Sequence, residues 1–183
     1  MEAEALALVR AVRQRLLGSP FSISVDCHSG FGRRDRLWCG YARSHRPIPH
    51  LAEIHTLKNL LESTYPHHHP YLIEPQSVNY TTHGDLWDYL YDLALEEHPK
   101  SIFLPFTLEM GSWLWVRKNP RQVLDFSGFF NPVTRHRHHR VLRQHLPLFE
   151  FLTTATASWQ RWIPLPHHRD QVMAEAISYW FDH

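Results

Sequence analysis

Two residues in this chain have the types and surroundings of catalytic groups. His28 follows the apolar segment 21–26 and precedes a glycine-containing loop, and Glu109 ends the apolar run 102–106. Imidazole is a common zinc ligand, and Asp26 lies on the same face of a strand, where it can fix the tautomer of His28. Burial would raise the pKa of Glu109 toward that of a general base. The alternatives are a histidine that caps a loop and a glutamate at an exposed strand end.

Two further positions are candidates for contacts with a substrate. Tyr80 lies in a polar loop just before a predicted helix, where its hydroxyl could reach over a site, and the alternative is a surface aromatic on the helix start. Arg33, Arg34 and Arg36 follow His28 closely. We take Arg33 as the candidate to bind a substrate carboxylate, and the alternative is a solvated loop.

The elements that must position these residues alternate between helix and strand. Apolar spacing predicts helices, and runs of strand-forming residues bounded by glycine and proline predict strands, so the expected class is α/β in a single domain over 1–183. Residues 29–49 are expected to form a long loop, and Pro105 is expected at an edge or bulge of its strand. The predicted helices cover 3–17, 50–63, the segment after Gly84, 133–145, 146–162 and 167–181, and the strands cover 21–26, 71–74 and 101–109.

Composition excludes several classes of partner. Lys and Arg number 19 against 18 Asp and Glu, so no strong charge attracts nucleic acid or anionic lipid. The two cysteines argue against a disulfide scaffold and favour a reducing compartment. No apolar run approaches the roughly 20 residues of a membrane helix. We therefore expect a cytoplasmic protein without membrane or nucleic-acid partners, and its oligomeric state is not predicted.

Three segments together resemble the zinc metallocarboxypeptidases of the pancreatic carboxypeptidase type, and they occur in the family's order. Residues 24–29 resemble the strand end that carries the family's third zinc ligand. Tyr80, with Gly84 and residues 88–91, resembles the segment of the mobile substrate-binding tyrosine. Residues 106–109 resemble the segment of the catalytic glutamate. The resemblance covers most of the chain from about residue 21.

The resemblance implies a fold, a cofactor and a reaction. The fold would be a mixed sheet flanked by helices, carboxypeptidase-like, and apparently without the N-terminal part of the domain. His28 would bind Zn²⁺ with Asp26 behind it, Glu109 would act as general base and acid, and Tyr80 would contact the substrate. The reaction would be hydrolysis of a C-terminal bond in a peptide or small amide substrate.

The resemblance also implies zinc ligands that cannot be assigned. The family's first two ligands come from a His-x-x-Glu segment before the third, and no histidine precedes His28. A catalytic zinc normally has three protein ligands. We therefore expect the C-terminal half of such an enzyme, a truncated relative, or a variant with other ligands. The alternatives are an amidase or deacylase of the same clan, acting on N-acyl amino acids, and a non-catalytic module without metal.

Other possible metal sites are weaker in their spacing. His50 and Glu53 form a His-x-x-Glu segment, but it follows His28 and starts an ordinary amphipathic helix. The histidines at 67–69 fit a solvated loop, and Cys27 and Cys39 match no structural zinc pattern. The basic run 135–143 could recognise phosphate or an acidic substrate tail, and the alternative is a solvated helix face.

Overall fold

A four-stranded mixed sheet forms the centre of the protein. The computed structural model describes residues 2–29, 32–67, 71–111, 113–124 and 127–182. The sheet order is β1-β4-β2-β3, in which β1 is parallel to β4, β4 is antiparallel to β2, and β2 is parallel to β3. The predicted α/β class with a mixed sheet is therefore confirmed. The strands are β1 (Phe21–His28), β2 (Asp35–Cys39), β3 (Tyr71–Pro75) and β4 (Ile102–Glu109).

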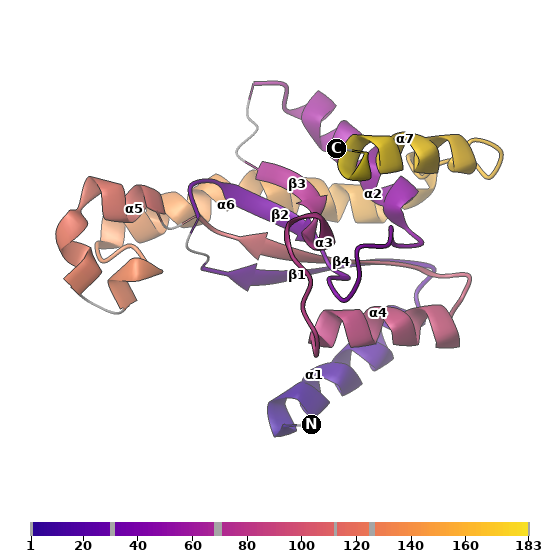
Figure 1. Cartoon of the computed structure of the whole chain (residues 1–183), viewed down its shortest axis with the longest axis horizontal. Helices are drawn as coiled ribbons and strands as arrows, with labels where there is room; N and C mark the ends of the chain where they lie inside the picture. Colours follow the sequence, from indigo (N-terminus) through magenta and orange to yellow (C-terminus); the bar gives the residue numbers. More distant parts are fainter. Residues whose placement is uncertain (1, 30–31, 68–70, 112, 125–126, 183) are drawn as a thin grey trace.

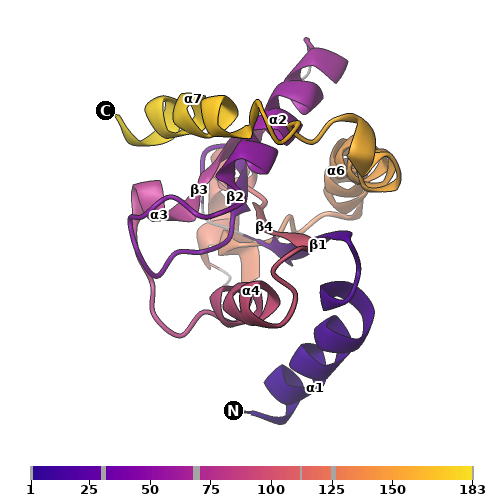
Figure 2. The same cartoon turned by 90° about the vertical axis from the view of Figure 1, so that its right-hand side faces the viewer.

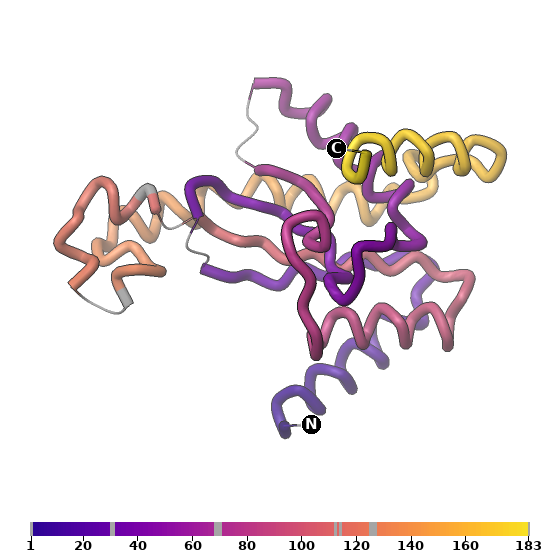
Figure 3. Tube along the Cα trace, viewed as in Figure 1, coloured from indigo at the N-terminus to yellow at the C-terminus, as the bar shows by residue number. Residues whose placement is uncertain are grey.

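Helices cover the two faces of this sheet (Figures 1 and 2). One face carries α4, with α1 beyond it, and the other carries α2, α6 and α7. The trace in Figure 3 shows the N-terminal helix and the C-terminal helix on opposite sides of the sheet. The helices are α1 (Ala3–Val12), α2 (Leu51–Thr64), α3 (Gln76–Asn79), α4 (Leu86–Glu97), α5 (Trp113–Lys118), α6 (Arg135–Ala157) and α7 (Arg169–Phe181), with a π-helical turn at Arg13–Leu17 and 3₁₀ turns at Pro120–Leu124, Ser127–Phe129 and Trp159–Arg161.

The alternation of side chains separates an apolar face from a polar face of the sheet. Leu37, Ile73 and Phe106 point toward α2 and α6, where they meet Ile54 and Phe151. The intervening residues point to the α4 face. At the carboxyl ends of β1 and β4, this second face gathers polar and aromatic side chains from every strand: Asp26, His28, Arg36, Trp38, Glu74, Thr107 and Glu109.

Two sequence predictions about strands are wrong. The predicted loop over 29–49 contains β2, a short strand with charged and aromatic residues that pairs with both β3 and β4. Pro105 lies in an interior strand rather than at an edge. Its lack of an N–H is tolerated because the β2 ladder ends at Cys39 opposite Phe106, and the Pro105 carbonyl still accepts from the Gly40 N–H at 2.9 Å.

The predicted break between residues 145 and 146 is also wrong. The helix α6 continues through Pro147 to Ala157. A proline inside a helix costs about 3 kcal/mol, but Leu148, Phe151 and Leu152 are buried against the core on the following turns. Burial of each such side chain contributes about 1.5–3 kcal/mol, which outweighs that cost.

Among the residues that the structure describes, no helix is both long enough and apolar enough to cross a membrane.

Candidate functional site

His28 and Glu109 end two neighbouring parallel strands and lie side by side. They are register partners in the β1–β4 ladder, and Nδ1 of His28 is 3.4 Å from Oε1 of Glu109. The His28 side chain is half exposed, whereas that of Glu109 is 20% exposed. Strand ends of α/β sheets are common places for ligand binding. The sequence predicted roles for both residues separately, and the structure places them together.

Asp26 holds the other nitrogen of the His28 ring. Its Oδ2 lies 2.9 Å from Nε2 of His28 and also accepts a hydrogen bond from the indole N–H of Trp87 at 2.9 Å. An ionised carboxylate only accepts hydrogen bonds, so Nε2 must carry the proton in this contact. The lone pair of a neutral His28 is then on Nδ1, which faces Glu109.

The surroundings shift the pKa values of the two residues. Burial lowers the pKa of His28, but the hydrogen bond and charge of Asp26, with the charges of Glu109 and Asp85, outweigh it, so the net shift is upward. Burial raises the pKa of Glu109, and the nearby His28 opposes this shift only in part. Glu109 is therefore a carboxylate with more proton affinity than one in water, as a general base requires.

Two cavities meet at this pair of residues. The larger has a volume of about 520 Å³ and is lined by Arg34, Arg36 and Phe130 among others. The second, of about 370 Å³, extends toward the start of α4 and is lined by Asp85 and Trp87 among others. The residues common to both cavities are His28, Trp38, Tyr80 and Glu109.

Tyr80 lines both cavities. It follows α3 and is 45% exposed, and its ring makes a T-shaped contact with the ring of Trp38, with centroids 5.6 Å apart. An exposed loop tyrosine can move with little loss of packing. The structure therefore places this predicted substrate-binding residue at the wall of both cavities.

The arginines after His28 differ in position. Arg33 is exposed and does not line either cavity. Arg34 and Arg36 both line the larger cavity. Substrate binding by Arg33 stays a prediction, whereas Arg34 and Arg36 share a cavity with Glu109.

The weaker metal candidates have structural roles. Nδ1 of His50 forms a hydrogen bond with the Tyr91 hydroxyl, at 2.8 Å. The Glu53 side chain is 3% exposed, and its Oε1 lies 2.7 Å from Nε of Arg169.

Among the described residues, the other metal candidates do not gather into a site either. Cys27 is exposed, whereas Cys39 is buried, and both are free thiols. His67 is described, but positions 68 and 69 lie outside the described residues. Over the described part of the chain, no group of three or more His, Cys, Asp and Glu side chains is arranged to hold a metal ion.

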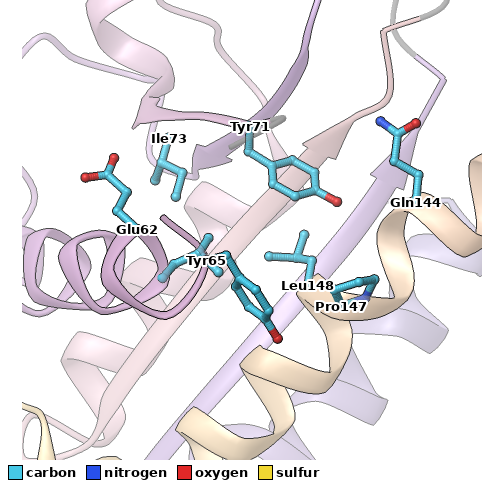
Figure 4. Close-up of a pocket in the computed structure, with 8 residues that line it drawn as sticks. Glu62, Tyr65, Tyr71, Ile73, Gln144, Pro147 and Leu148 are labelled. Carbon is cyan, nitrogen blue, oxygen red and sulfur yellow. The ribbon is translucent and has the colours of Figure 1, made fainter. Parts of the chain in front are cut away.

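A third recess lies on the opposite face of the sheet, between α2, β3 and α6 (Figure 4). Its volume is about 20 Å³, which is room for about one water molecule. Tyr71 and Leu148 line this recess, and the Tyr71 hydroxyl lies 2.7 Å from Nδ1 of His145. It is part of the packing between α6 and the sheet, away from His28.

The sequence did not single out two residues of the site. Trp87 was not assigned a role, because its bond to Asp26 joins positions far apart in the chain. Arg36 was grouped with its neighbours because the strand that orients it, β2, was not predicted. The alternation Arg36-Leu37-Trp38-Cys39 was the available signal for that strand.

Comparison of this chain with protein families, with curated proteins and with solved structures found no match.

Proposed function

We propose that this chain carries the catalytic carboxylate and one zinc ligand of a metallocarboxypeptidase-like hydrolase that cleaves a C-terminal peptide or amide bond. The observation that carries the proposal is the contact between His28 and Glu109 at the ends of two parallel strands. The resemblance of three segments to the zinc metallocarboxypeptidases motivates the same two roles.

The donor set around His28 fits one position in the coordination sphere of a zinc ion. Asp26 holds Nε2, as an acceptor behind a zinc-ligating histidine commonly does. A neutral His28 then turns the lone pair of Nδ1 toward a carboxylate oxygen 3.4 Å away. Two acceptors at that distance repel unless a proton or a cation stabilises them. The raised pKa of His28 favours a second proton on the ring, and a zinc ion would be another occupant of the same place. The described residues do not supply the usual three protein ligands, so His28 alone would hold that ion.

Glu109 is the proposed general base and acid. Its raised pKa suits removal of a proton from the attacking water and later delivery of that proton to the leaving amine. Tyr80 is proposed to contact the substrate from the shared wall of the two cavities. Bound zinc would polarise the scissile carbonyl and lower the pKa of a bound water to about 7.

A second candidate reaction is deacylation of an N-acyl amino acid. Trp38, Tyr80 and Phe130 line the larger cavity and offer apolar surface to an acyl group. Glu109 would act as the general base and acid in this reaction as well. A screen that compares C-terminal peptides with N-acyl amino acids decides between the two substrate classes.

The experiment that tests the proposal measures zinc retention. The purified chain is dialysed to equilibrium against a buffer that contains zinc, because a site with few protein ligands binds zinc weakly. Bound zinc is then measured by elemental analysis beside His28→Ala and the control His136→Ala, which changes an exposed histidine on α6. We expect the wild type and the control to retain zinc and His28→Ala to lose it. A wild-type chain that retains no zinc contradicts the proposal and favours a non-catalytic module.

A further inference from the structure

Arg36 shares one end and one face of the sheet with Glu109. The two residues are opposite each other in the antiparallel β2–β4 ladder. Opposite side chains in such a ladder project to the same face. Arg36, Glu109 and His28 accordingly line the same cavity of about 520 Å³.

The guanidinium of Arg36 is held through one of its amino groups. Nη1 donates to Oε1 of Glu74 at 3.0 Å and to Oδ1 of Asn79 at 3.1 Å. The guanidinium carbon also lies 5.6 Å from the centroid of the Trp38 ring. The plane of the guanidinium is thus oriented before any ligand arrives, which lowers the entropy cost of binding.

Glu74 is itself held in place and can anchor Arg36 firmly. Its Oε1 accepts hydrogen bonds from the Trp38 indole at 3.2 Å and from the Asn79 amide at 2.9 Å, in addition to that from Arg36. The Glu74 side chain is 13% exposed. This network of four side chains joins β2, β3 and α3 next to Tyr80.

The edge of the Arg36 guanidinium formed by Nε and Nη2 carries N–H groups that can donate to a ligand. Within the described part of the chain, Nε and Nη2 of Arg36 make no hydrogen bond, and the side chain is 36% exposed. Arg34 adds a second positive charge on the wall of the same cavity. Two N–H groups on one edge of a guanidinium match the two oxygens of a carboxylate.

We propose that Arg36 forms an anion subsite in this cavity and binds a carboxylate of the substrate through Nε and Nη2. The carboxylate is either the terminal one or that of an acidic side chain, since the two share this chemistry. The subsite would bind the substrate of the proposed hydrolase, so its role in turnover rests on the proposed function. Carboxylate binding itself requires neither zinc nor turnover and is therefore tested separately.

The test is a titration of the full chain, without added zinc, followed by nuclear magnetic resonance. The probes are N-acetyl-phenylalanine, its carboxamide, and N-acetyl-glutamate α-amide, which carries only a side-chain carboxylate. In the wild type, we expect the Arg36 Nε–H resonance to shift with at least one carboxylate probe and not with the carboxamide. The carboxylate probe that binds more tightly identifies the source of the anion.

Matched variants separate Arg36 from its neighbours. Arg36→Gln should weaken binding of the carboxylate about 10-fold or more, because two charge-assisted hydrogen bonds are lost. Arg10→Gln, an exposed change on α1, should bind as the wild type does. Equal affinity of the wild type for carboxylate and carboxamide, or an unchanged Arg36→Gln, overturns the proposal. The wild-type resonance remains decisive if Arg36→Gln does not fold. Carboxylate binding by the chain, together with no hydrolysis after zinc is added, would contradict the proposed function and leave the subsite standing.

Discussion

His28 and Glu109 are register partners on parallel strands, and Nδ1 of His28 lies 3.4 Å from Oε1 of Glu109. On the far side of the imidazole, Asp26 binds Nε2 at 2.9 Å. The histidine is thus held between two carboxylates at the junction of two cavities. The proposed chemistry depends on this arrangement.

Trp87 is predicted to position Asp26 and, through it, His28. Trp87→Phe removes the indole N–H that donates to Asp26 Oδ2 and keeps an aromatic ring against Phe103. Loss of a partner behind a ligating histidine typically weakens metal affinity by about 10- to 100-fold. Trp87 contacts Asp26 and not His28 itself, so we expect an effect at the lower end of this range. The zinc affinity of Trp87→Phe, measured by competition with a chelator, should be about 10-fold lower than that of the wild type.

The control for Trp87 is Trp162→Phe, which removes an indole hydrogen bond to the Ala155 carbonyl, away from the site. This control should leave zinc affinity unchanged. At about pH 9, above the ordinary histidine pKa of about 6.5, the nitrogen resonances of His28 should report a proton on Nε2 in the wild type and a mixture of tautomers in Trp87→Phe. An unchanged tautomer in Trp87→Phe contradicts the positioning role.

The ion pair between Glu53 and Arg169 is predicted to stabilise the packing of α2 against α7. Arg169→Met leaves the carboxylate of Glu53, 3% exposed, without its partner. Breaking a fully buried pair costs about 3–5 kcal/mol. Because the Arg169 side chain is 34% exposed, we expect about 2 kcal/mol less free energy of unfolding in urea. The double variant with Glu53→Gln should recover part of that loss, and no recovery would contradict this explanation.

Acid is predicted to destabilise the protein through its buried histidines. Burial lowers the pKa values of His50, His55 and His145. Below about pH 6.5, the unfolded chain therefore binds more protons at these positions than the folded protein does. Stability falls as the pH drops below that value and continues to fall until the pH passes the lowered values. The raised pKa of His28 acts in the opposite direction.

His145→Asn isolates one of these contributions. His145 faces the Tyr71 hydroxyl and the charge of Asp35, and asparagine can still pair with the hydroxyl but cannot take up a proton. We expect the pH dependence of the unfolding free energy to become shallower by up to about 1.4 kcal/mol per pH unit between about pH 6.5 and 5. His136→Asn, on the exposed face of α6, is the control. An equal slope in wild type and His145→Asn would contradict the prediction.

The sequence predicted those features of the site that depend on local spacing. The period of two places Asp26 and His28 on one face of β1, and their contact in the structure follows from it. The pairing of β1 with β4 joins segments far apart in the chain, and periodicity alone does not reveal it. The contact of His28 with Glu109 was therefore implied only through the family resemblance.

Features that depend on short or irregular elements were not predicted. The strand β2 has five residues between charged and glycine-containing segments, which is a weak signal. Without β2, the opposition of Arg36 to Glu109 could not be foreseen. Pro147 predicted a helix break on local grounds, but burial of the following residues keeps α6 continuous.

The most direct test of the central claim is hydrolysis by the zinc-loaded chain and by Glu109→Gln. We predict that the wild type releases the C-terminal residue of a peptide or the acyl group of an N-acyl amino acid. Glu109→Gln should retain zinc and lose about 10²- to 10⁴-fold in rate, while Glu150→Gln, an exposed change on α6, retains the wild-type rate. Wild-type turnover in Glu109→Gln would contradict the assignment of Glu109 as the general base.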